Sequence, residues 1–431
     1  MEYLVALPFL VMVIALLLGV PIAFSLAGAG ILGIYLYTGS WNMVIGILGM
    51  APFSTVADYA LTTIPMFILM AYFSASSGLA RDLYTAGANW LSHIRGGLGI
   101  ATVFACGIFG AMSGASVAAA SVMSAIAYPE MRRFGYSEEL AAGTVGIGAT
   151  LDILIPPSVA MVIYGITTQT SIGKLLIAGV VPGIIVGIFL ALAIFVWVTV
   201  RPQDAPQTFR VSSAERWAGT LRIWPSLLLI LIVLVLLYTG VVTPTEVGAI
   251  GAFMAAAIGF AFGRLTWKGA WEALKLTIRT TAMIFMILIG ATIFGYYMSL
   301  SRVPQHVVAA ITEMNLNRWV VMIGIVVCYF VISMFMDEIP LLLLTLQLTF
   351  PLITHLGFDP IWFGVMSMMM VAMGLVFPPV GMVAFVVSAT AKVDLVKVYT
   401  GTSVLMIAIV ITTILMSFFP EIATWLPATM R

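Results

Sequence analysis

The stretch LAAGTVGIGATLDILIPPSVAMVIYGITTQ, residues 140–169, decides the fold of this 431-residue chain. It is apolar and long enough to cross a membrane, but Pro156 and Pro157 interrupt it near its middle. Two adjacent prolines remove two backbone donors and clash with the preceding turn, so a helix must break there. Inside a bilayer the freed carbonyl groups need partners, because no water is available to them. The stretch therefore predicts a broken membrane helix whose exposed backbone faces a polar partner.

The composition of the whole chain supports a membrane setting. Hydrophobic residues make up 62% of the chain and charged residues only 8%, whereas soluble domains carry about a quarter charged residues. The apolar runs are continuous, which fits spanning helices and excludes the alternating strands of a membrane barrel. We predict an all-α polytopic membrane protein. The net charge of +1 gives no electrostatic argument for binding nucleic acid.

The broken segment occurs twice. Residues 361–390, IWFGVMSMMMVAMGLVFPPVGMVAFVVSAT, contain Pro378 and Pro379, which follow the first proline pair by 222 positions. Cys106 and Cys328 share this offset. A constant offset between several landmarks predicts an internal repeat.

The repeat divides the chain into three parts. We predict a first repeat at 1–200, a cytoplasmic linker or surface helix at 201–223, and a second repeat at 224–431. Basic residues set the orientation, because cytoplasmic loops are enriched in Lys and Arg. No Lys or Arg precedes Arg81, so we expect the N-terminus outside. The same reasoning makes the second repeat inverted relative to the first.

Each repeat is expected to contain a re-entrant hairpin, at about 97–131 and about 319–355, followed by a broken helix at about 140–169 or 361–390. The arms of the first hairpin have about 15 residues each, fewer than the roughly 20 that a full span needs. Basic residues flank both ends of this hairpin, which suits one side of the membrane. Two short, tilted full spans are the alternative.

Each hairpin tip is expected beside its broken helix. Freed carbonyl and hydroxyl oxygens there suit a dehydrated Na⁺, and half-helix N-termini suit an anionic solute. The predicted binding residues are Ser113, Gly114, Ala115, Ser116, Thr150, Asp152, Pro156, Pro157 and Ser158, and in the second repeat Met336, Asp337, Glu338, Gly374, Pro378 and Pro379. The expected Na⁺ ligands are Ser113, Gly114, Ser116, Thr150 and Pro156, and Met336, Asp337, Gly374 and Pro378. A structural kink that binds nothing is the alternative.

Three acids, Asp152, Asp337 and Glu338, fall at predicted membrane depth. Ionisable side chains there are costly and usually mark an ion or substrate path; pairing with a cation or a wet interface is the alternative. They also make a proton the alternative coupling ion. An intramembrane enzyme would need a nucleophile–base pair or a metal cluster at this depth, so we predict no catalytic residue. No cofactor is expected beyond the coupling ion.

Several motifs are similar to those of one transporter family. They are GVPIA at 19–23, SGASVA at 113–118, PEMRRFGY at 129–136, LIPPS at 154–158, GFDPIWFGV at 357–365 and PPVG at 378–381. Together they resemble the large, DctM-like membrane subunit of TRAP (tripartite ATP-independent periplasmic) transporters over nearly the whole chain. Family members often have Gly where Asp152 stands, and many have Glu and Thr where this chain has Ala372 and Phe377.

The resemblance implies secondary active transport in the bacterial inner membrane. It implies Na⁺-coupled uptake of a small organic anion, a carboxylate or sulfonate, by an elevator motion. It also implies two partners, which are a small four-helix membrane subunit and a periplasmic substrate-binding protein. A channel and a stand-alone ion-coupled carrier that needs no binding protein are the rival transport functions.

Overall fold

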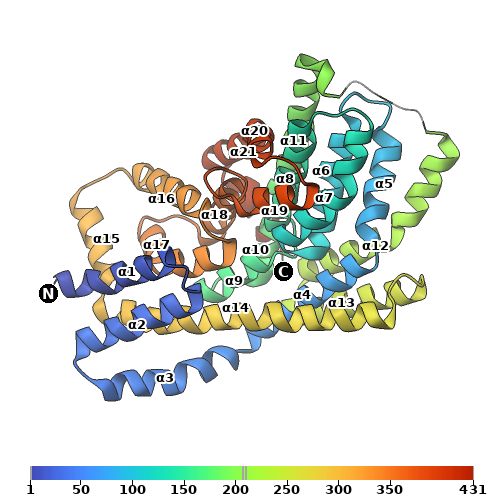
Figure 1. Cartoon of the computed structure of the whole chain (residues 1–431). Coiled ribbons are helices and arrows are strands. Elements are labelled where there is room, and N and C mark those ends of the chain that lie inside the picture. Colours follow the sequence, from blue (N-terminus) through green and yellow to red (C-terminus); the bar gives the residue numbers. More distant parts are fainter. Residues whose placement is uncertain (1, 206–207, 209–210, 431) are drawn as a thin grey trace.

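The computed structural model describes residues 2–205, 208 and 211–430. Every regular element in this part of the chain is a helix (Figure 1), as the composition predicts. Within the described residues, seven helical segments are long and apolar enough to cross a membrane, namely Tyr59–Ser76, Ile172–Val200, Ser213–Thr239, Pro244–Ala261, Trp267–Ser301, Glu338–His355 and Leu395–Phe418. The prediction of an all-α polytopic membrane protein is confirmed.

The elements follow the chain in two series. Those of the first half are α1 (Glu2–Leu17), α2 (Ile22–Thr38), α3 (Trp41–Val56), η1 (Tyr59–Thr62), α4 (Thr63–Ser76), α5 (Leu79–Leu91), α6 (Gly97–Ser113), α7 (Ser116–Arg133), α8 (Glu138–Ala149), η2 (Thr150–Ile153), α9 (Val159–Thr168), α10 (Ile172–Ala178) and α11 (Val180–Val200). After η3 (Pro202–Asp204) come α12 (Ser213–Thr239), α13 (Pro244–Ala261), α14 (Trp267–Ser301), α15 (Val303–Glu313), α16 (Arg318–Ser333), α17 (Glu338–His355), α18 (Pro360–Gly374), α19 (Met382–Ala391), α20 (Leu395–Leu405), α21 (Ile407–Phe418) and α22 (Glu421–Ala428).

The polar segment 201–223 is not separate from the second half along its whole length. Its second part forms the first turns of α12, which begins after Ser212. The Ser212 hydroxyl accepts from the Glu215 N–H, and the Glu215 carboxylate accepts from the Ser212 N–H. This capping box starts the helix inside the polar segment, so the part between the two halves is shorter than the sequence suggests.

α3 forms over residues 41–56, a stretch whose local sequence does not favour a helix. Two glycines and Pro52 lie inside this helix, and each has low helix propensity. Val44, Ile47 and Ala51 are nevertheless buried, because α3 packs against α2 and α14. Tertiary packing has overridden local preference.

Two pairs of long helices lie closely against each other: α2 packs along α14, and α4 packs along α13 (Figure 1). A Cβ atom added at Gly30 of α2 would lie 2.8 Å from the backbone nitrogen of Phe294. One added at Gly251 of α13 would lie 2.4 Å from the Met70 sulfur. Small residues thus bring these helix axes close together, as is usual in membranes.

Two helical hairpins follow the same plan. α6 and α7 are joined at Gly114 and Ala115, where Gly114 adopts the left-handed conformation with φ of 58°. α16 and α17 are joined by residues 334–337. α6 and α7 have 17 and 18 residues, more than the arms of about 15 expected from the sequence and close to the roughly 20 of a full span. The length of the arms is therefore compatible both with a re-entrant hairpin and with two tilted full spans.

Both segments break around their proline pairs, and the helix before each pair ends several residues ahead of it. In the first, α8 ends at Ala149, and α9 begins at Val159 after the cis Pro156–Pro157 bond. In the second, α18 ends at Gly374, and α19 begins at Met382 after the cis Pro378–Pro379 bond. The two breaks differ in burial, because Pro156 and Pro157 are buried whereas Pro379 is exposed.

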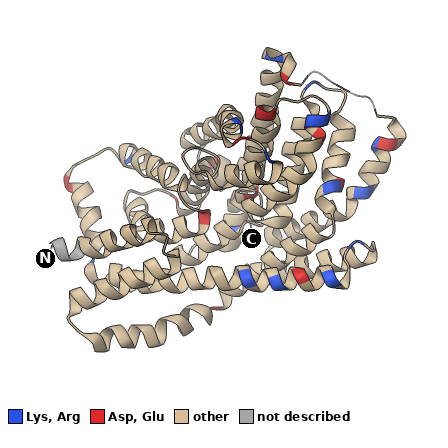
Figure 2. Cartoon of the chain, viewed as in Figure 1, with Lys and Arg blue, Asp and Glu red and all other residues tan. Residues whose placement is uncertain are grey.

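Charged side chains gather toward one side of the molecule. Figure 2 shows most of them at the ends of α5, α7, α11 and α12 and along the N-terminal part of α14. The helices between these ends and the opposite side carry few charges. This distribution suits spanning helices with a polar cytoplasmic end.

Candidate functional site

The first hairpin tip lies directly against the first helix break. The Ser116 hydroxyl donates to Asp152 Oδ1 at 2.7 Å. A Cβ atom added at Gly110 would lie 2.6 Å from the Asp152 Cβ atom, and one added at Gly114 would lie 2.8 Å from the Pro157 carbonyl oxygen. Glycine is therefore required where α6 and the tip meet the break.

The second hairpin tip lies against the second break in the same way. The Gly381 N–H donates to the Met334 carbonyl at 2.9 Å, and the Ser333 hydroxyl lies 3.3 Å from the Met370 carbonyl. A Cβ atom added at Gly374 would lie 1.8 Å from the Ser333 oxygen. The sequence analysis missed Ser333, Met334 and Gly381, since the register of this tip against the break depends on tertiary packing.

Side chains from α20 bind freed carbonyl groups of the second break. The Tyr399 hydroxyl lies 2.7 Å from the Val380 carbonyl and 3.1 Å from that of Pro379. The Thr402 hydroxyl donates to the Val376 carbonyl at 2.8 Å. The expectation that freed carbonyls face a cation is therefore incomplete here, because protein donors already occupy part of their capacity. A carbonyl oxygen has a second lone pair and can still bind a cation.

The two tips meet at one point. The Ser116 oxygen lies 3.1 Å from Glu338 Oε2, across 222 residues of chain. Ser116 is the first residue of α7 and Glu338 the first of α17, so the N-terminal ends of two hairpin helices converge. The sequence analysis placed these residues in separate sites. Their separation equals the repeat offset, which is the signal that could have related them.

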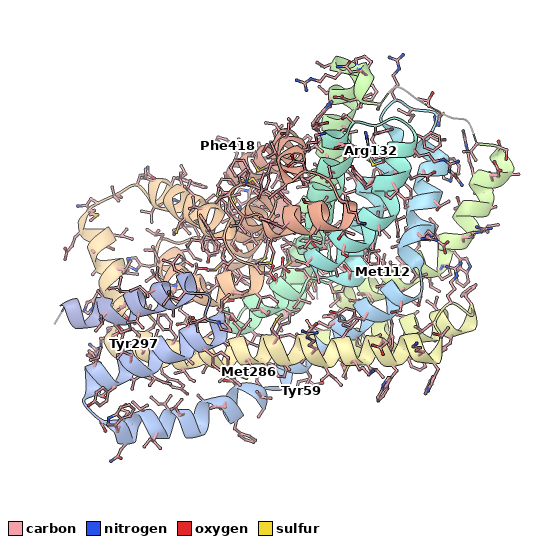
Figure 3. The ribbon with its side chains drawn as sticks, in the orientation of Figure 1. Tyr59, Met112, Arg132, Met286, Tyr297 and Phe418 are labelled. Atoms are coloured by element: carbon pink, nitrogen blue, oxygen red, sulfur yellow. The ribbon has the colours of Figure 1, made fainter. Side chains whose placement is uncertain are left out.

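A cavity of about 780 Å³ lies between this meeting point and the long helices α2, α4 and α14. Residues of both hairpins line it, including Ser116, Asp337 and Glu338. The opposite wall is largely apolar and includes Phe24, Met283 and Met286; Figure 3 labels Met286 on α14. The cavity thus touches both hairpin tips and the helices that pack outside them.

Buried polar atoms remain without a partner around the first tip. Asp152 is 1% exposed, and its second carboxyl oxygen has no partner among the described atoms. The same holds for the Ser113 hydroxyl, which is 3% exposed. Buried polar groups are rarely left unsatisfied in proteins. These two oxygens are therefore available to a bound ion or solute.

Three other predicted residues, Thr150, Ser158 and Asp337, make hydrogen bonds within the protein. The Thr150 hydroxyl donates to the Ile147 carbonyl at 2.8 Å, and the Ser158 hydroxyl caps α9 by accepting from the Met161 N–H. Asp337 caps α17, because its carboxyl oxygen accepts from the Glu338 N–H at 3.0 Å. No group of three or more His, Cys, Asp and Glu side chains suited to a metal occurs in the described part of the chain.

Comparison with known proteins identifies the family of this architecture. Residues 9–422 match the sequence model of the tripartite ATP-independent periplasmic transporter, DctM component.

The chain belongs to this family. The C4-dicarboxylate TRAP transporter large permease protein DctM of Pseudomonas aeruginosa is 34% identical over 376 residues, which cover 87% of this chain and 88% of that protein. The ectoine TRAP transporter large permease protein TeaC of Halomonas elongata is 31% identical and covers 95% of this chain and 96% of its own length. This DctM-family chain is therefore a multi-pass transport protein, like its relatives, and not an enzyme.

Solved structures show a similar fold at low sequence identity. The Alcanivorax borkumensis YdaH transporter has a TM-score of 0.61 and 15% identity, and the alignment covers 89% of this chain and 88% of that one. Neisseria gonorrhoeae MtrF has a TM-score of 0.58 and 13% identity over 86% of this chain and 84% of its own. These likenesses concern the fold alone.

Proposed function

We propose that this chain is the translocating subunit of a Na⁺-coupled secondary transporter. It imports a small organic acid, a carboxylate or sulfonate, which a periplasmic binding protein delivers. A small four-helix membrane subunit completes the complex in the bacterial inner membrane. The observation that carries this proposal is the single cavity at which both hairpin tips meet the long helices of the opposite wall.

The arrangement supports an elevator motion. Each of the pairs α2–α14 and α4–α13 contains one helix from each half of the chain. Two interlocked inverted repeats pack in this way. Their close glycine contacts favour a rigid scaffold. The hairpins and broken helices form the moving part, which carries solute and ion past that scaffold.

The Na⁺ ions travel with the solute as a second cargo. The expected first group, Ser113, Gly114, Ser116, Thr150 and Pro156, offers hydroxyl and carbonyl oxygens, which are the ligands that hard cations prefer. The unpartnered Ser113 hydroxyl supports this assignment. The second group, Met336, Asp337, Gly374 and Pro378, adds one carboxyl group. A proton is the second candidate as coupling ion, favoured by the buried acids Asp152 and Glu338.

The solute class rests on the relatives. Their names specify C4-dicarboxylates, isethionate, sialic acid and ectoine, so members of the family handle organic acids of several shapes. The binding protein, which is a separate chain, is expected to choose among them.

Uptake into proteoliposomes tests the proposal. The chain is reconstituted with its small subunit, and an inward Na⁺ gradient is imposed with and without the binding protein. Accumulation that needs both the gradient and the binding protein is the expected result. Accumulation without the binding protein would identify a stand-alone carrier, and a proton gradient that replaces Na⁺ would identify the proton as coupling ion.

The hairpin topology has its own test. A cysteine placed at Ser113 should react with a membrane-impermeant thiol reagent only when the transporter opens to water. Constant labelling from outside, in every transport state, would show that α6 and α7 cross the membrane fully and that the tip is an external loop.

A further inference from the structure

The cavity between the hairpin tips and the long helices has an unusual charge for a site that binds organic acids. Asp337 and Glu338 line it, and none of its lining residues is Lys, Arg or His. Asp152 lies directly behind Ser116, whose hydroxyl contacts both Asp152 and Glu338. Two carboxyl groups therefore line a cavity whose lining has no basic side chain, and a third lies one hydrogen bond behind it.

These carboxyl groups have no ionic partner among the described residues. No ion pair in the described residues involves Asp152, Asp337 or Glu338. Asp337 accepts one backbone N–H, and Glu338 shares the Ser116 hydroxyl with Asp152. In a medium of low dielectric constant, a buried carboxylate is costly and takes up a proton unless a cation pairs with it. The cavity therefore favours ligands that bring positive charge.

The coupling ions do not neutralise all three carboxyl groups. One Na⁺ at each tip would offset two of the three carboxyl groups. A dicarboxylate would then add two further negative charges beside an unpaired acid, with no guanidinium, ammonium or imidazole in the cavity lining to receive them. A positively charged nitrogen on the solute would instead meet that acid directly.

The remaining walls suit the same kind of solute. Ile284, Ile287 and Met283 provide apolar surface. Phe24 and Tyr72 add aromatic rings to the lining, and the faces of such rings attract cations. The Tyr72 hydroxyl is 2.9 Å from that of Thr280, which leaves its ring as the part free for apolar contact.

We propose that the cavity binds its solute through a positively charged nitrogen group held by Glu338, so that the transported organic acid is a zwitterion with an apolar body rather than a dicarboxylate. This inference rests on the proposed function, since it takes the cavity as the solute site. It specifies the substrate class from the permease itself, independently of what the binding protein selects.

Equilibrium binding to the purified permease and its small subunit, in lipid nanodiscs with saturating Na⁺, tests the inference. Two matched probe pairs are used: 6-aminohexanoate with adipate, and taurine with isethionate. The members of each pair share a chain and one acidic group and differ in whether the other end is an ammonium group. We expect the ammonium member to bind at least about tenfold more tightly, since a charge pair a few ångströms apart easily supplies that difference. Equal binding, absent binding or a preference for the ammonium-free member overturns the inference.

Variants assign the preference to Glu338. Glu338→Gln should reduce it to less than about threefold, and Glu338→Ala serves in its place if the first variant does not fold. Glu130→Gln, near the far end of α7, is the matched control and should keep the full preference. If both Glu338 variants keep the preference, Glu338 does not determine it and the assignment is overturned. Neither a gradient nor the binding protein enters this assay, so its outcome is distinct from a failure of Na⁺-coupled uptake.

Discussion

Replacing Ser116 with alanine tests whether the contact between the two hairpin tips stabilises the fold. The Ser116 hydroxyl is 2.7 Å from Asp152 Oδ1 and 3.1 Å from Glu338 Oε2, and all three side chains are at least 95% buried. Removing it leaves Asp152 Oδ1 without its donor and Glu338 Oε2 without its contact to the hydroxyl oxygen. Losing a hydrogen bond to a buried polar group costs about 1–3 kcal/mol. Because two buried carboxyl groups lose this contact, we expect a loss near the upper end, about 3 kcal/mol.

The matched control is Ser124→Ala. Ser124 lies on the same helix, is 1% exposed, and its hydroxyl has no partner among the described atoms. Removing an unpartnered buried hydroxyl relieves desolvation, so its free energy of unfolding should change by less than about 0.5 kcal/mol or rise slightly. Both variants are purified with the small subunit and unfolded by denaturant, with tryptophan fluorescence as the signal. If Ser116→Ala is no less stable than Ser124→Ala, the tip contact is not a stabilising bond and the reasoning is wrong.

Three further predictions concern the breaks and the scaffold. Pro156→Ala and Pro379→Ala should each lower uptake more than expression, because each adds a backbone N–H and removes the fixed ring from the break. Uptake per inserted protein measures this, and unchanged uptake in both would argue against a functional break. Tyr399→Phe should lower the free energy of unfolding by about 1 kcal/mol, measured by denaturant, since it removes a donor from the second break; an unchanged midpoint would mean that water replaces it. Gly30→Ala should destabilise the scaffold by about 1–3 kcal/mol, because the added methyl group clashes with α14. Gly28→Ala, whose added Cβ atom would meet nothing within 4 Å, should be neutral or stabilising. Similar shifts of the thermal midpoint for the two variants would refute the packing argument.

Glu338 and Asp152 could be identified as candidate site residues from the sequence, but their hydrogen-bond partner could not. Each was identified from the sequence because an acid in an apolar segment is costly unless it has a partner. Which partner it has could not be read from the sequence, because the pairing depends on how hairpins distant in the chain meet. The structure gives both acids the same partner, Ser116.

The helix breaks were determined by the sequence alone. Pro156–Pro157 and Pro378–Pro379 cannot continue a helix in any surroundings, since the lost donors and the ring clash are local. The membrane setting is equally independent of tertiary structure, because a chain with 8% charged residues has too little polar surface to face water. Residues with fixed local chemistry therefore determine the helical class and the approximate position of the breaks.

Tertiary structure decided the rest. α3 forms despite its glycines and Pro52 because α2 and α14 bury one face of it. Tyr399 and Thr402 bind the carbonyls of the second break from a different helix, and nothing in their local sequence marks them. These contacts join segments that are separate along the chain, so their free energy appears only once packing has brought the partners together.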